Sequence, residues 1–200
     1  NQELTYLQDM VDITKLIAVY NMQGNAEDES GYSHNGTTSN ITYGSDTWGG
    51  KSSIFNGTNA NISIPDNTRF NFSASFDIYI WAKWTSTTTG MHLLSKRLEG
   101  DVFQDNVYQP NVFTASGDNG ISIQVNAATA GDVRTQIGGI LITSSSAGFN
   151  DGEWHLIRVT RDLNNLVTLY VDTISKGTST VTGNFTTTED LTIGSDFYGS

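Results

Sequence analysis

Three carboxylates stand side by side early in the chain, at Glu27, Asp28 and Glu29. They follow the apolar stretch 16–22 and precede a turn-forming sequence, Ser-Gly-Tyr-Ser-His-Asn-Gly. Carboxylates can serve a glycoside hydrolase as acid and nucleophile, or they can bind calcium together with carbonyl oxygens of tight turns. The third possibility is structural, because an Asp in a turn accepts hydrogen bonds from nearby backbone N–H groups.

Other residue types give less support for catalysis. The chain has no cysteine, which excludes a disulfide framework, a thiolate metal site and a cysteine nucleophile. None of its histidines, His34, His92 and His155, lies near a Gly-x-Ser-x-Gly nucleophile elbow. The sequence therefore predicts no catalytic residue and a protein that is not an enzyme.

Aromatic side chains offer a different chemistry, the binding of carbohydrate, which needs aromatic rings and planar polar groups around a groove or rim. Trp48 lies in the glycine-rich sequence Gly-Ser-Asp-Thr-Trp-Gly-Gly, and the polar segment 97–110 has the composition of a variable binding loop. The residues that we expect to bind a ligand are Trp48, Tyr32, Tyr108, Asp101 and Asp105. The tryptophans that we expect to pack within the sheets are Trp81, Trp84 and Trp154.

The elements that must position these residues are short strands. Only 16% of the residues are charged, and Gly, Ser, Thr and Asn supply most of the polar remainder, which is typical of strands and turns. Apolar runs bounded by turn sequences predict strands at 16–22, 52–56, 61–65, 76–84, 91–96, 111–115, 120–126, 138–144, 153–161, 166–172 and 191–195. No helical pattern intervenes between them, so the predicted fold class is all-β, an antiparallel β-sandwich or jelly roll.

A single domain, 15–200, accommodates all of these strands. Residues 1–14 have apolar residues at helical spacing and are predicted as a short helix or linker. In 76–84 large side chains alternate on both faces, so we expect a central strand that is covered on both sides. The sequence GTNA joins 52–56 to 61–65 in what we expect to be a hairpin.

The charge and the apolar content narrow the choice of partners. The formal net charge is −11, and such a field repels phosphate backbones, so we expect no nucleic-acid partner. No apolar run approaches the roughly 20 residues of a membrane-spanning helix, so we expect no membrane insertion. The chain starts at Asn1 and shows no signal peptide, so we expect a mature product or a piece of a longer protein.

Several stretches resemble one known family, in the order in which they occur. LIAVYNMQGNAEDESGYSHNGT, from Leu16, resembles the opening of laminin-G-like modules of the concanavalin A-like lectin/glucanase superfamily. SSIFNGTNANISIPD, SFDIYIWAKW and DGEWHLIRVTRD are similar to its hairpin, its central strand and its Trp-His strand, and VTLYVD and LTIGS are similar to its late strands. The ordered set covers nearly the whole chain.

The resemblance implies a concanavalin A-like fold and several properties of the site. Family members often bind calcium at the first loop, which carries over to Asp28 as a metal ligand. The Trp-His motif implies that His155 is a structural residue. The glucanase branch carries a Glu-x-Asp-x-x-Glu pattern, which no strand of this chain has. The family's last strand, which lies beside the first, is missing. We therefore expect a fragment of a larger surface protein; the alternatives are a protein neighbour that completes the sheet next to Leu16–Met22, or pairing by the N-terminal segment.

Together these features favour a non-catalytic extracellular recognition or adhesion module that binds a glycan or a cell-surface polymer. The alternative is a structural domain: a decoration, capsid or tail-fibre domain of a virion, or a spacer in a large adhesin. A polysaccharide hydrolase is less favoured. All of these functions place the protein outside the cell, on a cell surface or on a virion surface.

Overall fold

The structure, a computed structural model, describes residues 15–97, 120–144 and 147–195. One sheet contains β5 (Phe76–Ala82), β10 (His155–Arg161), β11 (Leu166–Val171) and β12 (Ile174–Thr180). The other contains β1 (Thr37–Ser39), β4 (Asn61–Ile64), β6 (Met91–Arg97), β7 (Gly120–Val125), β8 (Val133–Ile137), β9 (Ile140–Thr143) and β13 (Leu191–Ile193). A separate hairpin pairs β2 (Thr42–Ser45) with β3 (Lys51–Ile54).

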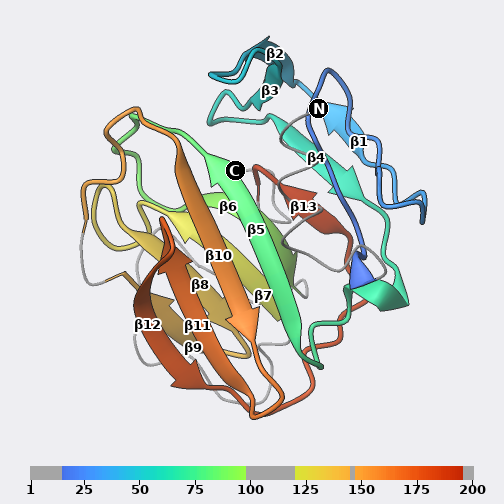
Figure 1. Cartoon of the computed structure of the whole chain (residues 1–200), viewed down its shortest axis with the longest axis vertical. Coiled ribbons are helices and arrows are strands. Elements are labelled where there is room, and N and C mark those ends of the chain that lie inside the picture. The colour runs from blue at the N-terminus through green and yellow to red at the C-terminus, as the bar shows by residue number, and fades with distance from the viewer. Residues whose placement is uncertain (1–14, 98–119, 145–146, 196–200) are drawn as a thin grey trace.

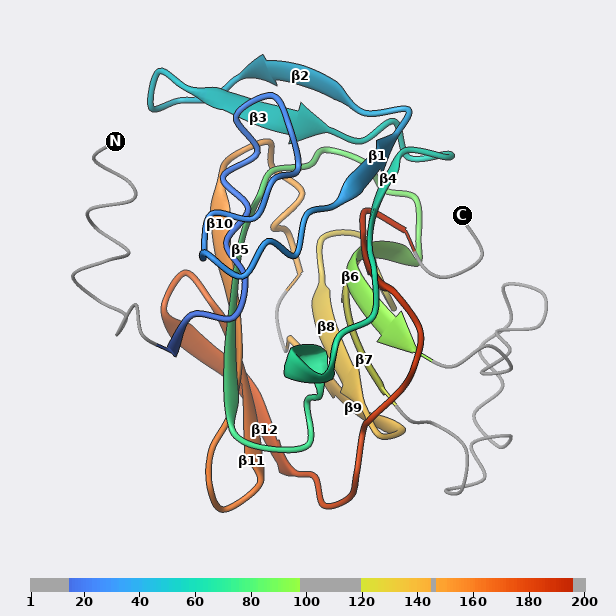
Figure 2. The same cartoon turned by 90° about the vertical axis from the view of Figure 1, so that its right-hand side faces the viewer.

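The two sheets stack face to face, and the hairpin lies across one end of the stack (Figures 1 and 2). The strand order is β12-β11-β10-β5 in the four-stranded sheet and β1-β4-β13-β6-β7-β8-β9 in the seven-stranded sheet. Every pairing is antiparallel. The predicted all-β antiparallel sandwich is confirmed.

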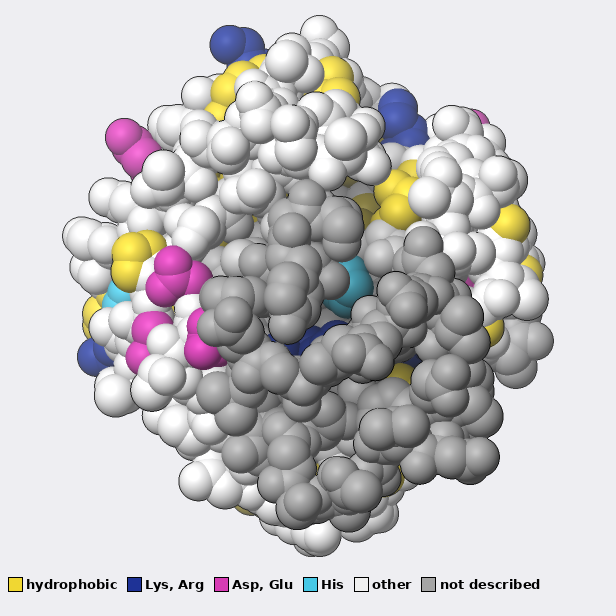
Figure 3. All heavy atoms as spheres, turned by 180° about the vertical axis from the view of Figure 1, so that it is seen from behind, with side chains coloured by type: hydrophobic (Ala, Val, Ile, Leu, Met, Phe, Trp, Pro, Cys, Tyr) yellow, Lys and Arg dark blue, Asp and Glu magenta, His cyan; other side chains and the backbone are white. Residues whose placement is uncertain are grey.

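Alternation of side chains builds the core between the sheets. Along β10, Ile157 and Val159 point inward and are fully buried. The residues that alternate with them, Leu156, Arg158 and Thr160, are partly exposed. From the opposite sheet, Ile121, Ile123 and Val125 of β7 are buried in the same way. Burying such a side chain contributes about 1.5–3 kcal/mol, so these rows account for much of the stability. Seen from the side of the seven-stranded sheet, hydrophobic side chains form only small patches on the described surface (Figure 3).

The segment 16–22, predicted as the first strand, joins neither sheet, so this prediction is wrong. The carboxylate loop holds its backbone instead: Val19 N donates to Asp28 Oδ1 (2.9 Å) and Val19 O accepts from Glu29 N (2.9 Å). Its alternate side chains nevertheless pack against the core; these are Ala18, Tyr20 and Met22. The apolar alternation therefore predicts burial here, but not pairing.

Two predictions about pairing are also wrong. β5 pairs only with β10 among the described strands, so it is an edge strand rather than a central one. β3 pairs with β2, whereas β4 pairs with β1 and β13, so the predicted hairpin of 52–56 with 61–65 does not form. The predicted helix at 1–14 and the predicted strand at 111–115 lie outside the described residues. Within the described chain, no helix is long and apolar enough to cross a membrane.

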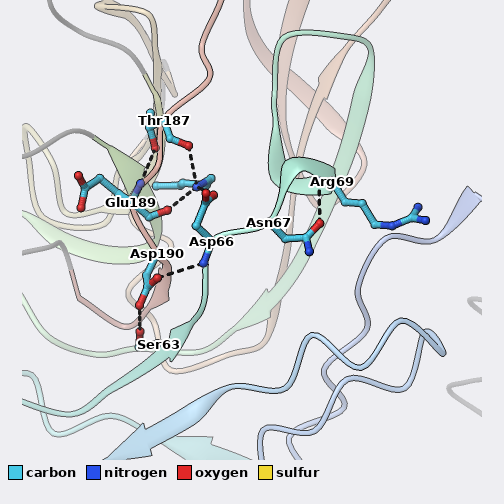
Figure 4. Close-up of polar contacts among 8 residues, drawn as sticks. Ser63, Asp66, Asn67, Arg69, Thr187, Glu189 and Asp190 are labelled. Carbon is cyan, nitrogen blue, oxygen red and sulfur yellow. Dashed lines mark hydrogen bonds and ion pairs between the residues drawn. The ribbon is translucent and has the colours of Figure 1, made fainter.

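A buried lysine, Lys96 of β6, binds acceptors next to two other strands of the seven-stranded sheet, and Figure 4 labels these acceptors, Asp66, Thr187 and Glu189. Lys96 lies opposite Ile121 in β7, in the inward row, and its side chain is 1% exposed. Its ammonium group donates to Asp66 Oδ1 (2.6 Å) and to the carbonyl oxygens of Thr187 (3.2 Å) and Glu189. These acceptors precede β13 or follow β4, so one cation closes this end of the core.

Replacing Lys96 with methionine removes the donor and leaves Asp66 and two backbone carbonyl groups unpaired. Breaking a buried ion pair in this way costs about 3–5 kcal/mol, and we expect the lower end because Asp66 is partly exposed. Denaturant unfolding of K96M against the wild type measures the loss in the free energy of unfolding. The exposed Lys51→Met is the control and should change it by less than about 0.5 kcal/mol. Equal losses in the two variants would contradict the assignment.

Candidate functional site

The turn between β2 and β3 is built to present one side chain, that of Trp48. Asp46 Oδ1 accepts hydrogen bonds from Trp48 N (2.9 Å) and Gly50 N (2.7 Å), and Asp46 N donates to Gly50 O (3.1 Å). Gly49 has a φ of +85°, a conformation that L side chains rarely adopt. The sequence Asp-Thr-Trp-Gly-Gly therefore closes the turn through its backbone and leaves the indole free to point away.

Gln23 joins this hairpin to the N-terminal segment. Its Nε2 donates to Lys51 O (3.0 Å), and its Oε1 accepts from Lys51 N (2.9 Å), so the amide pairs with the edge of β3 as a backbone would. A Cβ atom at Gly50 would lie 2.6 Å from Gln23 Nε2, so only glycine fits beside this contact. The turn that carries Trp48 is thus held by Asp46 from within the hairpin and by Gln23 from the N-terminal segment.

Trp48, Trp81 and Trp154 form an exposed tryptophan cluster. The ring centroids of Trp48 and Trp81 are 5.4 Å apart with an interplanar angle of 65°, and those of Trp48 and Trp154 are 5.5 Å apart at 46°. Trp48 is 51% exposed and Trp81 is 43% exposed. Lys83 Nζ lies 5.3 Å from the Trp154 ring centroid, and within the described chain the Trp154 N–H has no acceptor.

The sheet explains why these rings face outward. Trp81 of β5 lies opposite Leu156 of β10, in the row that points away from the core. His155, between Trp154 and Leu156, points inward, where its Nδ1 lies 2.8 Å from Asp172 and its Nε2 lies 3.1 Å from Asp151. Burial lowers the pKa of His155, but its hydrogen bonds to the carboxylates of Asp172 and Asp151 outweigh burial, and the net pKa is raised.

The prediction that Trp81 and Trp154 pack within the sheets is wrong for Trp81, which is exposed on the outer face. Trp84 is buried as expected, and its Nε1 donates to Asn126 Oδ1 (3.2 Å). A signal was present in the sequence: 76–84 carries large residues on both faces, and in an edge strand one of those faces meets solvent. Trp48, which we expect to bind a ligand, is 51% exposed.

A polar unit lies on the same outer face. Asp77 binds Arg158 through two hydrogen bonds, from Nε to Oδ1 (2.8 Å) and from Nη2 to Oδ2 (2.6 Å), and it accepts a third from the Tyr79 hydroxyl (3.0 Å). The Arg158 guanidinium lies 5.1 Å from the Tyr79 ring centroid and 5.2 Å from that of Tyr170. Burial raises the pKa of Tyr79, and the Asp77 charge raises it further.

Tyr32, which we also expect to bind a ligand, does not join the tryptophan cluster. Tyr32 stacks with His34, at 6.0 Å between ring centroids, and Arg69 lies 3.9 Å from its centroid, so this aromatic side chain belongs to a separate surface beside η2 (Thr68–Phe70). The remaining expected residues lie outside the described part of the chain; these are Tyr108, Asp101 and Asp105.

Asp28 organises its own loop. Oδ1 accepts from Val19 N (2.9 Å) and Ser30 N (2.9 Å), and Oδ2 accepts from Ser30 Oγ (2.8 Å) and His34 N (3.0 Å). Burial pushes the pKa of Asp28 up, but these hydrogen bonds outweigh burial and hold the pKa below its usual range.

A calcium ion at Asp28 would have to displace donors from carboxylate oxygens that already accept four hydrogen bonds. The described residues also contain no group of three or more His, Cys, Asp or Glu side chains that could hold a metal ion. Calcium at Asp28 stays an untested prediction.

Comparison with known proteins places the fold. A sequence model of the concanavalin A-like lectin/glucanases superfamily matches residues 56–200. No curated protein matches the chain in sequence.

Among solved structures, the binding domain of Paraclostridial Mosquitocidal Protein 1 aligns with a TM-score of 0.61 and 14% identity, over 88% of this chain and 42% of that one. Domain 4 of AbnA, a GH43 extracellular arabinanase from Geobacillus stearothermophilus in complex with arabinotriose, aligns with a TM-score of 0.57 and 16% identity, over 86% and 79%. The botulinum neurotoxin serotype D binding domain aligns with a TM-score of 0.58 and 11% identity, over 89% and 43%. The chain thus spans about two fifths of the toxin binding domains that it matches.

The hydrogen bonds of Asp28 predict a pH-dependent stability. Because its pKa is lower in the folded than in the unfolded chain, its contribution is fully present above about pH 4 and is lost as the pH falls through the folded pKa. We expect Asp28→Asn to lower the free energy of unfolding at pH 7 by about 2 kcal/mol. Denaturant unfolding between pH 7 and pH 2 measures this, and the two proteins should converge at the acidic end.

The neighbouring Glu27→Gln removes an equal charge from an exposed side chain, so it is the matched control. It should unfold as the wild type does at every pH. A difference between D28N and the wild type that stays constant down to pH 2 would contradict the role of the carboxylate.

Proposed function

The chain belongs to the concanavalin A-like lectin/glucanases superfamily, and from that premise we propose that it is a non-catalytic extracellular recognition module. Its ligand is a glycan or a cell-surface polymer, and its binding surface is the tryptophan cluster. The observation that carries this proposal is the pair of half-exposed indoles, Trp48 and Trp81, held at a fixed distance by a rigid turn and a strand.

Exposed aromatic rings that a scaffold holds in place suit the apolar faces of sugar rings. Trp combines a large apolar surface with a polar N–H, and it loses little conformational entropy when it binds. Leaving two such rings exposed forgoes the hydrophobic stabilisation that burial would provide. A binding role accounts for that cost, and the neighbouring Lys83 supplies a hydrogen-bond donor at the edge of the cluster.

Structures of similar fold support the same class of function. The arabinanase domain is described in complex with arabinotriose, and cell entry of botulinum neurotoxin type C is described as dependent on interaction with two ganglioside molecules. The arabinanase is extracellular, which supports the same location for this chain. These proteins share 12–16% identity with the chain, so they support a class of function and no particular residue.

Two of the described carboxylates, Asp46 of the hairpin turn and Asp77 of the outer sheet face, favour binding over hydrolysis. A glycoside hydrolase needs two carboxyl groups on opposite sides of the scissile bond. Asp46 accepts hydrogen bonds from the turn, and Asp77 is bound to Arg158 and Tyr79. Each of these two acids is committed to holding the structure, so neither is placed as an acid or a nucleophile.

A second candidate, a structural role in an assembly, is favoured by the edge of β5. The inward residues of β10 and β11 are fully buried, whereas Ile78 and Ile80 of β5 remain partly exposed. An edge strand with apolar residues is a template for pairing with another chain. We infer that a strand from a neighbouring copy could cover this edge, between β5 and the segment 16–22, as in a virion decoration, a tail fibre or a large adhesin.

The leading proposal predicts that Trp48→Ala and Trp81→Ala each weaken glycan binding about tenfold or more, since each removes one stacking ring. A glycan-array screen identifies the ligands, and calorimetry on the best of them compares the variants. Tyr32→Ala, an exposed aromatic residue outside the cluster, is the matched control and should bind as the wild type does. Wild-type affinity in both tryptophan variants, with their melting temperatures unchanged, would contradict the proposal. Repeating the screen with calcium and with a chelator tests the calcium prediction.

The assembly candidate predicts concentration-dependent association in sedimentation experiments. It also predicts that amide protection of Phe76–Ala82 rises with protein concentration, while that of His155–Arg161 stays constant because β10 is already paired on both sides. A chain that remains monomeric at millimolar concentration, with unchanged protection of β5, would exclude this assembly through copies of itself.

A further inference from the structure

We propose that the ion pair of Asp77 with Arg158 is a second subsite for the same glycan, and that the ligand is therefore a neutral, linear oligosaccharide longer than one sugar ring. This inference rests on the proposed function of the tryptophan cluster. It goes further because it names a second group of residues and the class of glycan that would contact both.

The register of the four-stranded sheet places the two subsites in line. Trp81 lies opposite Leu156, and the next outward row along the strands contains Tyr79, Arg158 and Tyr170. Successive outward rows are about 7 Å apart, because the rise is about 3.4 Å per residue. Asp77 lies one row further, so the surface from Trp81 to Asp77 extends about 13 Å along β5. That length exceeds a single sugar ring, so a ligand that spans it has more than one.

The guanidinium group of Arg158 is held in place before any ligand arrives. Its two hydrogen bonds to Asp77 form a fork, and the Tyr79 and Tyr170 rings lie on either side of it. The fork uses two of the five N–H donors of an arginine, which leaves donors on Nη1 and Nη2 for a ligand. The side chains of Arg158 and Asp77 are 35% and 37% exposed, so both reach solvent. A donor that is already immobilised loses little entropy on binding.

The chemistry of this unit selects a neutral glycan. Asp77 cancels the charge of Arg158, so the pair offers a donor and an acceptor side by side with no net charge. Adjacent hydroxyl groups of a sugar ring both donate and accept, and so they match it. An acidic polysaccharide would meet the Asp77 carboxylate and a chain with a net charge of −11, and both repel it.

The test is a length series measured by calorimetry on the full chain. The probes are neutral oligosaccharides of one, three and six sugars prepared from arabinan, xylan, β-glucan and mannan. We expect affinity to rise at least tenfold from one to six sugars for the series that binds. Arg158→Ala should lose about tenfold in affinity for the six-sugar ligand and less than twofold for the single sugar, because only the longer ligand reaches the second subsite.

Two further variants keep the test decisive. Arg158→Lys retains the charge and removes the fork, so it should lose affinity as Arg158→Ala does even if the alanine variant is less stable. Arg69→Gln alters an arginine that also stacks on an exposed tyrosine, Tyr32, but lies outside this sheet face, so it should bind as the wild type does.

Each outcome separates this inference from the proposed function. Affinity that does not grow with length, or that is insensitive to Arg158, overturns the second subsite while the tryptophan cluster still binds. Array hits that are confined to acidic glycans overturn the neutral class. An array with no hits at all overturns the proposed function as well, and a surface ion pair is then the whole role of Asp77 and Arg158.

Discussion

The stacking of two sheets with strict alternation of side chains is the constraint on which the other features depend. In β10, Ile157 and Val159 are fully buried between the sheets, and the inward-pointing His155 and Arg161 lie at the two ends of the strand. The residues that alternate with the inward ones, Leu156, Arg158 and Thr160, must then face outward, whatever their chemistry. Trp81, Tyr79 and Asp77 are the outward-facing residues of the neighbouring strand β5. The proposed binding surface thus consists of the outward-facing side chains of the strands whose inward-facing side chains form the core, and a slip of one residue in register would bury it.

The acidic composition has a structural explanation that charge alone does not reveal. Several aspartates accept backbone N–H groups in turns: Asp28 and Asp46 do so in their loops, Asp132 accepts from Ala128 (2.9 Å) and Thr129 (3.0 Å), and Asp162 accepts from Asn164 (2.8 Å). A chain with many short strands has many turns, and each turn exposes N–H groups that need acceptors. Much of the negative charge therefore shapes the loops.

The sequence predicts the layers better than the pairing. Runs such as 153–161 and 166–172 combine β-branched residues with alternation, and they form β10 and β11 as expected. β1, β2, β8 and β12 escape prediction. β1, β2 and β12 consist largely of Ser, Thr, Gly and Tyr, whose pattern does not differ from that of the loops, and β8 has only two apolar residues, Val133 and Ile137. The pairing of strands could not be predicted for another reason. β4 pairs with β13, which lies far along the chain, and a local apolar pattern carries no information about such a distant partner.

The site shows the same division. The exposure of Trp48 is predictable, because it lies in a glycine-rich turn rather than in a strand with a buried face. The exposure of Trp81 and Arg158 depends on which faces of β5 and β10 point away from the core, and the pattern of 76–84, with large residues on both faces, does not decide this. The cluster depends on the hairpin turn reaching the outer face, a contact between residues 48 and 81 that neither strand encodes by itself.

The central claim, that a glycan binds on the tryptophan cluster, is tested most directly by the indole N–H resonances of the chain's four tryptophans. We predict that adding the best glycan from an array shifts the resonances of Trp48, Trp81 and Trp154 and leaves that of Trp84 unchanged, because Trp84 is buried and bonded to Asn126. A glycan that binds while all four resonances stay in place would contradict the account.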